Sequence, residues 1–126
     1  MPEAKTGRAA VLGRVPIFSD LSDAELRFLS DRAVTRRHAS GELIFSEGDP
    51  CTGLYIVESG DVRIFKTSAA GREQVLTVEH AGNSVAELSI FDGGNYPASA
   101  SAATDCVLLF IREHLVHFLQ ILAGLR

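Results

Sequence analysis

The sequence has few of the residues that build metal centres or disulfide frameworks. Its 126 residues contain no tryptophan, one methionine and two cysteines, Cys51 and Cys106. Two isolated cysteines without a Cys-x-x-Cys pair cannot form a thiolate cluster, which excludes a structural zinc site of that type. A long-range disulfide between them stays open, but two reduced thiols are the default expectation for a protein of the cytosol.

Long apolar runs and excess positive charge are also absent. No stretch approaches the roughly 18 apolar residues of a membrane span, and the amino terminus lacks the apolar core of a signal peptide, so we expect no membrane association and a cytoplasmic protein. The net charge is −4 with a pI near 5.5. The basic cluster Arg36-Arg37-His38, beside Arg32, is interpreted as a solvated strand edge, so DNA binding by this chain alone is not expected.

Catalytic motifs are missing as well. The sequence has no nucleophile elbow, no phosphate-binding P-loop and no carboxylate pair at an informative spacing. Glu73 and Glu79 are carboxylates of the kind that any strand surface carries. The sequence therefore predicts that the protein is not an enzyme.

The length and composition predict one globular domain over residues 1–126. Helices are expected over about residues 7–31. The segment "LSDAELRFLSDR" carries a capping box, with Ser22 as N-cap and Glu25 three residues later, and Leu21 and Leu26 stand at the staple positions. A weaker helical turn is expected over residues 7–13.

Residues 34–111 show the rhythm of short strands and turns. Glycines recur at positions 41, 48, 53, 60, 71 and 82 between short apolar runs, which predicts a barrel or sandwich of antiparallel strands. Hairpins are expected around Ser59-Gly60-Asp61 and around Ala70-Gly71. In the strand after the second turn, Leu76 and Val78 share one face while Thr77 and Glu79 share the other. The apolar run "CVLLFI" predicts an interior strand.

A second helical zone covers residues 112–126. Its apolar positions are Leu115, Val116, Phe118, Leu119 and Leu122. This face is wide enough to contact both the domain and a partner.

The segment "VAELSIFDGGNYPASA", from Val85 to Ala100, interrupts the strand pattern. A helix of about one turn over Glu87–Phe91, ended by Asp92-Gly93-Gly94, explains it better than a strand. The amides at such a helix start, together with the helix dipole, favour an anion. A glutamate at a helix start also stabilises the dipole without any ligand, and that alternative stays open for Glu87.

The order and spacing of several short motifs resemble the cyclic-nucleotide-binding domain of the Crp/Fnr family of transcription regulators. The motifs are "EGDP" at 47–50, "LYIVESGDVRI" at 54–64, "GREQVL" at 71–76 and "AEL" at 86–88. The resemblance spans about Val15 to Leu119. It implies a mainly β fold with flanking helices, an eight-stranded jelly-roll β-roll of the double-stranded β-helix type. It also implies a homodimer formed through the C-terminal helix, which begins at 112–126, and a DNA-binding domain that is absent from this chain.

The same resemblance implies a ligand pocket. In the family a glutamate binds the ribose 2′-hydroxyl, backbone amides bind the cyclic phosphate, and an arginine neutralises it. The glutamate matches Glu87, Ala86 stands where the family has glycine, and the arginine position falls on Tyr96 or Pro97. The candidate ligand-binding residues are Val85, Ala86, Glu87, Leu88, Ser89, Tyr96, Pro97, Ala98 and Ser99.

The ligand itself stays open, because no arginine or lysine occurs between Arg72 and Arg112. Cyclic AMP or cyclic GMP is one candidate and haem is a second, with His80, His114 or His117 as the iron ligand. The iron–sulfur branch of the family is rejected, because no cysteine precedes Cys51. We therefore expect a small-molecule-sensing regulatory domain. The alternative is a dimerisation or interaction module that holds no small molecule.

Overall fold

The structure, a computed structural model, describes residues 2–85 and 94–124. Its helical elements are α1 (Pro2–Gly13), the 3-10 helix η1 (Pro16–Phe18), α2 (Asp23–Arg32) and α4 (Glu113–Gly124). Its strands are β1 (Val34–His38), β2 (Leu43–Phe45), β3 (Gly53–Ser59), β4 (Val62–Thr67), β5 (Glu73–Glu79), β6 (Ser84–Val85), β7 (Ser99–Ala102) and β8 (Cys106–Arg112). Among these residues, no helix is both long and apolar enough to cross a lipid bilayer.

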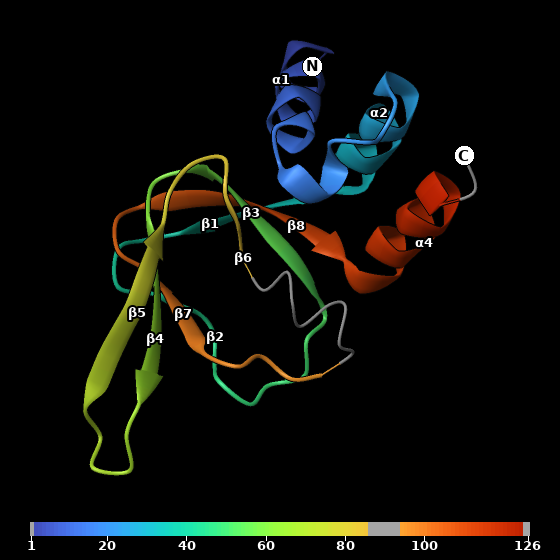
Figure 1. The fold of residues 1–126 in the computed structure, drawn as a ribbon. Coiled ribbons are helices and arrows are strands. Elements are labelled where there is room, and N and C mark those ends of the chain that lie inside the picture. Colours follow the sequence, from blue (N-terminus) through green and yellow to red (C-terminus); the bar gives the residue numbers. More distant parts are fainter. Residues whose placement is uncertain (1, 86–93, 125–126) are drawn as a thin grey trace.

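The strands form two antiparallel sheets of four strands each. The orders are β1-β8-β3-β6 and β2-β7-β4-β5. All three long helices lie at one end of the sheets, and the β4–β5 hairpin extends at the opposite end (Figure 1). The expected mainly β jelly-roll fold with flanking helices is confirmed.

Helix α2 begins where local sequence predicts. The Glu25 amide donates to the Ser22 hydroxyl at 3.2 Å, and the Ser22 amide donates to the Glu25 carboxylate at 2.9 Å. The preceding helix differs from the expectation. Instead of a turn over residues 7–13, α1 runs from Pro2 to Gly13. Its end packs into the core, because Leu12 and the following Val15 are fully buried.

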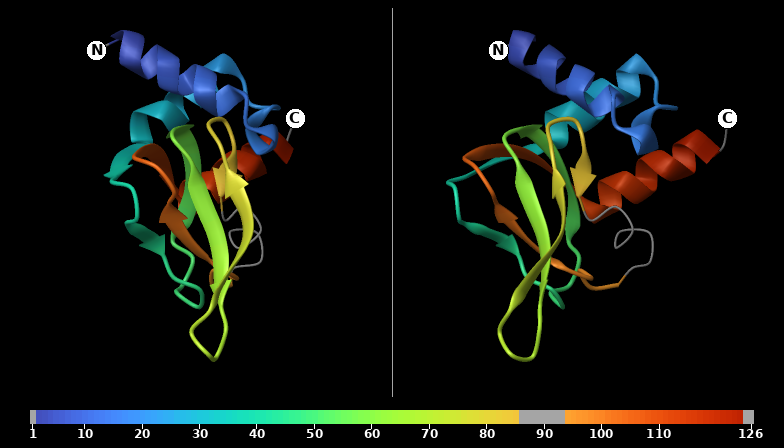
Figure 2. Two further views of the ribbon diagram at one scale, coloured as in Figure 1. Left: turned by 90° about the vertical axis from the view of Figure 1, so that its left-hand side faces the viewer. Right: turned by 60° about the vertical axis from the view of Figure 1, so that its left-hand side comes forward.

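The turn at Ser59-Gly60-Asp61 does not form the expected hairpin. Strands β3 and β4 belong to different sheets, so this turn carries the chain from one sheet to the other (Figure 2). Gly60 has a φ of 84°, and a Cβ at this position would overlap the Asp105 carbonyl oxygen and the Cys106 side chain. Turn composition alone does not distinguish a hairpin from such an arch, since both need a positive φ.

The second expected hairpin is confirmed. Strands β4 and β5 pair from Val62↔Glu79 to Thr67↔Glu73, and the bend includes Gly71 with a φ of 83°. The hairpin stands away from the rest of the molecule in two further views (Figure 2). Strand β5 lies at the edge of its sheet, and Val75, Leu76 and Val78 are all exposed.

Strand β8 is the interior strand that the run "CVLLFI" predicts. It pairs with β1 on one side and with β3 on the other. Its residues from Leu108 to Ile111 are buried, and Cys106 is a buried, unpaired thiol, as is Cys51. Burial raises the pKa of both thiols above their ordinary value.

Helix α4 follows β8 without a loop. Val116 and Leu119 are fully buried, whereas Phe118 is 48% exposed and Ile121 is 64% exposed. The helix therefore presents one apolar side to the domain and leaves a second apolar side uncovered by the described residues, as its sequence predicts.

Candidate functional site

A small pocket opens between the two sheets and forms the candidate functional site, called here the β-roll pocket. The described residues enclose about 180 Å³. They come from the end of β2, from β4, β5 and β6, and from the segment before β7. The lining residues are Phe45, Ile64, Thr77, Glu79, Ser84, Val85, Pro97 and Ala98.

One face of β5 supplies two of the polar residues in this lining. Thr77 and Glu79 both contact the pocket, while Leu76 is not among the lining residues. This agrees with the alternation read from "QVLTVEH". The Asn83 side-chain amide donates a hydrogen bond of 2.9 Å to the Glu79 carboxylate, which fixes the carboxylate beside the pocket.

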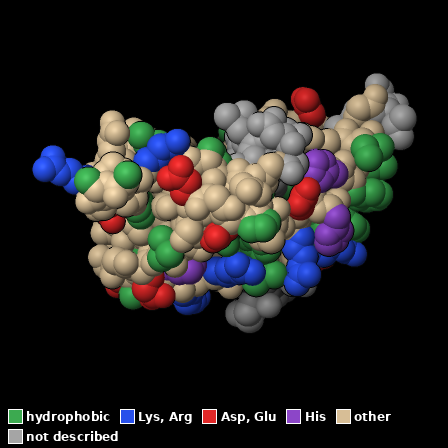
Figure 3. Space-filling view, turned by 90° about the horizontal axis from the view of Figure 1, so that it is seen from below, with side chains coloured by type: hydrophobic (Ala, Val, Ile, Leu, Met, Phe, Trp, Pro, Cys, Tyr) green, Lys and Arg blue, Asp and Glu red, His purple; other side chains and the backbone are tan. Residues whose placement is uncertain are grey.

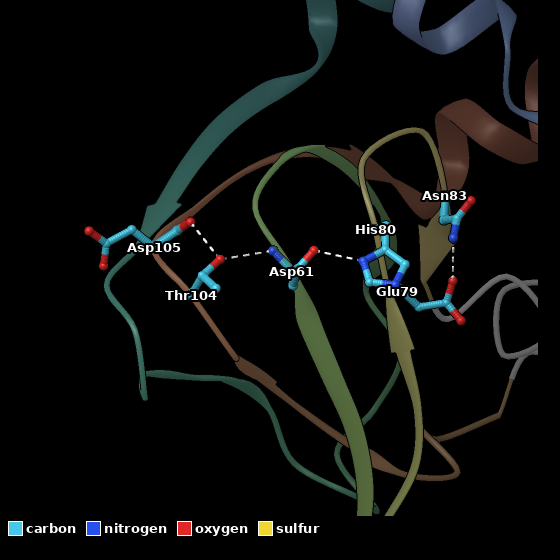
Figure 4. Close-up of polar contacts among 6 residues, drawn as sticks. All are labelled: Asp61, Glu79, His80, Asn83, Thr104 and Asp105. Atoms are coloured by element: carbon cyan, nitrogen blue, oxygen red, sulfur yellow. Dashed lines mark hydrogen bonds and ion pairs between the residues drawn. The ribbon is translucent and has the colours of Figure 1, made fainter.

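Further polar contacts hold the turns next to the pocket (Figure 4). Nδ1 of His80 lies 2.7 Å from a carboxylate oxygen of Asp61. The Asp61 amide donates to the Thr104 hydroxyl at 3.0 Å. These contacts tie the start of β4 to the end of β5 and to the turn before β8. They therefore position β6, which contributes Ser84 and Val85 to the pocket.

The structure brings together three of the nine candidate ligand-binding residues. Val85, Pro97 and Ala98 line the β-roll pocket. Four others, Ala86, Glu87, Leu88 and Ser89, lie outside the described residues, as does the expected one-turn helix. The remaining two, Tyr96 and Ser99, are described and serve other contacts.

Tyr96 is a core residue. Its ring stacks on Phe45, with 3.9 Å between the centroids and 15° between the planes, and it is 4% exposed. Its hydroxyl lies 3.4 Å from the Thr52 amide and 3.5 Å from the Gly53 carbonyl oxygen, to which it donates. Burial raises the pKa of the Tyr96 phenol above 10.0, so this side chain is neutral at ordinary pH. Tyr96 therefore supplies no charge in place of an arginine.

Ser99 supports a neighbouring turn. Its hydroxyl accepts a hydrogen bond of 2.8 Å from the Glu47 amide, and the side chain is buried. It thereby anchors the "EGDP" segment to β7. The expected role for Ser99 in ligand contact gains no geometric support from this arrangement.

The β-roll pocket has no basic side chain among its described lining residues, and Glu79 is its charged group. The sequence places no lysine or arginine between Arg72 and Arg112, a range that includes residues 86–93. An anion in this pocket would depend on backbone amides and hydroxyls, without a nearby cation.

None of the four histidines is among the residues that line this pocket. His80 pairs with Asp61, His117 lies 3.5 Å from Glu113, and His114 stands near the start of α4. His38, at the end of β1, lies 4.0 Å from Glu42. Among the described residues, no group of three potential metal ligands forms.

Sequence reasoning missed five lining residues: Phe45, Ile64, Thr77, Glu79 and Ser84. Side chains along β5 alternate between its two faces, which places Thr77 and Glu79 on one face and Leu76 and Val78 on the other. This alternation was the sequence signal that could have identified Thr77 and Glu79 as lining residues. Nothing local in the sequence places Phe45 and Ile64 opposite β6, because that proximity depends on how the two sheets face each other.

Two facing four-stranded sheets, a pocket between them and helices at one end define a jelly-roll β-roll domain. The family model for the cyclic nucleotide-binding domain matches residues 35–123. The chain therefore belongs to the cyclic nucleotide-binding domain family, and the resemblance inferred from its motifs is confirmed.

Its relatives include transcription regulators and kinase subunits. The chain is 36% identical over 94 residues to the cyclic AMP receptor protein of Thermus thermophilus, covering 75% of this chain and 44% of that protein. It is 37% identical over 94 residues to a cAMP-dependent protein kinase regulatory subunit of Hypocrea atroviridis, covering 75% of this chain and 19% of that protein. The chain thus spans less than half the length of these relatives.

Solved structures give the same result. The sensor domain of the transcriptional regulator DNR from Pseudomonas aeruginosa superimposes with a TM-score of 0.85 at 26% identity, covering 98% of this chain and 89% of that one. The Thermus thermophilus catabolite activator protein has a TM-score of 0.74 at 33% identity, covering 86% of this chain and 53% of that one.

Proposed function

We propose that the chain is the ligand-sensing domain of a Crp/Fnr-type transcription regulator, and that its β-roll pocket binds a cyclic phosphate only weakly. The observation that carries this proposal is the absence of lysine and arginine among the described residues that line the pocket. Pro97, which lines the pocket, is one of the two positions where the family resemblance places the arginine.

The expected loss of affinity follows from the missing contact. A hydrogen bond to a charged group contributes about 1.5–3 kcal/mol, so its absence weakens binding roughly 10- to 150-fold. A site of micromolar affinity would then bind at about a tenth of a millimolar. An uncharged ligand loses nothing by the absence of the arginine, so the pocket favours such a ligand.

A series of neighbouring aromatic rings connects the β-roll pocket to the strand that leads into α4. Phe45 lines the pocket and lies 5.7 Å from the Tyr55 ring, which lies 4.9 Å from the Phe110 ring on β8. Strand β8 continues into α4 at Glu113. A ligand that binds better to one arrangement of these rings would shift the population of α4 positions, and a separate DNA-binding domain would respond.

The expected homodimer fits the same proposal. The exposed apolar side of α4, with Phe118 and Ile121, would pack against the same side of a second subunit. The alternative function, an interaction module without a small-molecule ligand, needs this surface but not the pocket.

Calorimetry with cyclic AMP, cyclic GMP and adenosine tests the proposal. We expect cyclic AMP to bind no more than a few-fold better than adenosine, with a dissociation constant above about 100 μM. Cyclic AMP binding tighter than about 10 μM would contradict the weak-phosphate assignment. If none of the three compounds gives heat but the protein is a stable dimer, the interaction module is supported. A Soret band on haem addition, without nucleotide binding, would support haem as the ligand.

A further inference from the structure

The β-roll pocket has an apolar inner wall and a charged group near its opening. Phe45, Val85 and Ala98 line the pocket and are buried, whereas Thr77 lines it and is exposed, and Glu79 is partly buried. None of the described lining residues belongs to α4, whose hydrophobic side chains gather beside histidines at one end of the molecule (Figure 3). The surface proposed for contact with a second copy is therefore not part of this pocket.

The Glu79 carboxylate is held in place, but its charge is not balanced by the described residues. The Asn83 side-chain amide donates to one carboxylate oxygen at 2.9 Å (Figure 4). No lysine, arginine or histidine among the described residues forms an ion pair with Glu79. A neutral amide orients the carboxylate without removing its charge, and a carboxylate can accept several hydrogen bonds. Glu79 can therefore accept a further hydrogen bond from a ligand.

The basic side chains of β4 and of the turn after β5 do not supply the missing positive charge, because each has another carboxylate partner. These pairs are Arg63 with Glu73 at 2.9 Å, Lys66 with Glu47 at 3.8 Å, and His80 with Asp61 at 2.7 Å. None of the three basic residues lines the pocket. Between Arg72 and Arg112 the sequence has five acidic residues and no lysine or arginine. The charge that this part of the chain brings to the pocket is therefore negative.

The size and the charge of the pocket together select a class of ligand. The described residues enclose about 180 Å³, and a cavity of about 150 Å³ holds a benzene molecule. A single ring with one short substituent therefore fits. A carboxylate forms a stronger hydrogen bond with a charged donor than with a neutral one. A metal ion is disfavoured as the cation, because no group of three metal ligands forms within the part of the chain that the structure describes.

We propose that the β-roll pocket binds a small organic cation, a protonated primary amine attached to a single apolar ring. The ammonium group donates to the Glu79 carboxylate, and the ring contacts Phe45 and Val85. This inference rests on the proposed function, since it names the chemical class of the ligand for the same pocket. The same carboxylate repels a cyclic phosphate, which agrees with the weak phosphate binding proposed above.

A titration followed by the chemical shifts of the backbone amides tests the inference with three matched probes. Benzylamine carries an ammonium group, benzyl alcohol has the same ring with a neutral hydroxyl, and benzoate has the same ring with a negative charge. Compounds of this size bind with dissociation constants on the order of 1 mM. We expect benzylamine to bind about fivefold more tightly than benzyl alcohol, and benzoate to bind more weakly than either. The largest shifts should occur at Thr77, Glu79, Val85 and Ala98.

Two variants of β5 assign the selectivity to one carboxylate. Glu79→Gln removes the charge and keeps an oxygen that can accept the hydrogen bond from Asn83. We expect this variant to bind benzylamine about fivefold more weakly, at the level of benzyl alcohol, and to change benzyl alcohol binding less than about twofold. Glu73→Gln is the matched control, because Glu73 lies on the same strand and does not line the pocket. Glu73→Gln should leave the binding of all three probes unchanged.

Several results would overturn the inference. Equal affinities of benzylamine and benzyl alcohol for the unmodified chain would show that charge does not select the ligand, and this comparison does not depend on how a variant folds. Equal losses of benzylamine binding in Glu79→Gln and Glu73→Gln would indicate general charge attraction. Shifts centred on residues outside the pocket would place the amine elsewhere. The cyclic AMP and adenosine titrations test the ligand-sensing proposal separately, so the two proposals can fail independently.

Discussion

The rings of Phe45 and Tyr96 stack at 3.9 Å, and this contact joins the wall of the β-roll pocket to the protein core. Phe45 lines the pocket, whereas Tyr96 is buried behind it and bonded to the segment before β3. Tyr96 is one of the two positions where the family resemblance places the arginine. In this structure it packs behind the pocket wall and does not line the pocket.

The first prediction concerns this stacked pair. Tyr96→Ala removes a buried ring and leaves a cavity, so the free energy of unfolding should fall by about 3–5 kcal/mol. Tyr96→Phe keeps the stack and loses only the hydroxyl contacts, for a loss of about 1 kcal/mol. Urea denaturation measures both. Equal losses in the two variants would show that the hydroxyl, and not the stacking, stabilises this region.

Alkaline pH should destabilise the fold. Burial raises the pKa of Cys51 and Cys106 above 9.0 and of Tyr55 and Tyr96 above 10.0. A group whose folded pKa is raised contributes stability below its unfolded pKa, and this contribution is lost as the pH rises through the folded pKa. The free energy of unfolding should therefore be constant near pH 8 and fall above about pH 9, by up to about 1.4 kcal/mol per pH unit for each group. Urea denaturation across this range measures it, and Tyr96→Phe should reduce the slope above about pH 10.

The arch between β3 and β4 depends on Gly60. Alanine at position 60 would have to adopt an unfavourable φ of 84°. Its Cβ would also overlap backbone atoms of the turn before β8. We expect Gly60→Ala to lower the free energy of unfolding by more than about 2 kcal/mol. Gly71→Ala is the matched control, because its φ is 83° but nothing lies near the added Cβ. That variant should lose only about 1 kcal/mol, the cost of the backbone conformation alone.

Restoring a cation should restore phosphate binding. Pro97→Arg places a guanidinium at the edge of the β-roll pocket, so cyclic AMP should bind roughly 10- to 150-fold more tightly. Binding of adenosine should not change. Asn95→Arg adds the same charge at an exposed residue that does not line the pocket, and it should have little effect. Calorimetry that shows equal gains in both variants would indicate general charge attraction instead of a local contact.

Self-association through α4 is the fifth prediction. Ile121 is 64% exposed, so Ile121→Glu should leave the fold intact and place a charge on the proposed contact surface. We expect the dimer dissociation constant, measured by analytical ultracentrifugation, to rise at least tenfold. Arg72→Glu at the hairpin tip introduces the same residue away from α4 and serves as control. A dimer that resists Ile121→Glu must form through a different surface.

Features governed by neighbouring residues were predictable from the sequence. The start of α2 depends on Ser22 and Glu25, which lie three residues apart and satisfy each other's backbone amides. The β4–β5 hairpin closes over a short loop. Strand β8 is apolar from Cys106 to Ile111, and most of these residues are buried. These elements need no knowledge of distant segments.

Features that depend on how the two sheets face each other were not predictable from the sequence. The turn at Gly60 has the composition of a hairpin, but the two strands that it joins pair with other partners. Tyr96 follows a run of small and polar residues, and it becomes a core residue through contacts with segments distant in the sequence, the Phe45 ring of β2 and the backbone of Thr52 and Gly53. Of the five candidate residues that the structure describes, three line the β-roll pocket, whereas Tyr96 and Ser99 make other contacts. That any of them binds a ligand stays a prediction.

The β4–β5 hairpin offers a practical consequence. Its tip, residues 68–72, is exposed throughout and lies at the end of the molecule opposite the three long helices. A tethering peptide inserted between Ala70 and Gly71 would interrupt no strand. The domain could thus be immobilised on a sensor surface by this tip, with the helical end left facing the solution.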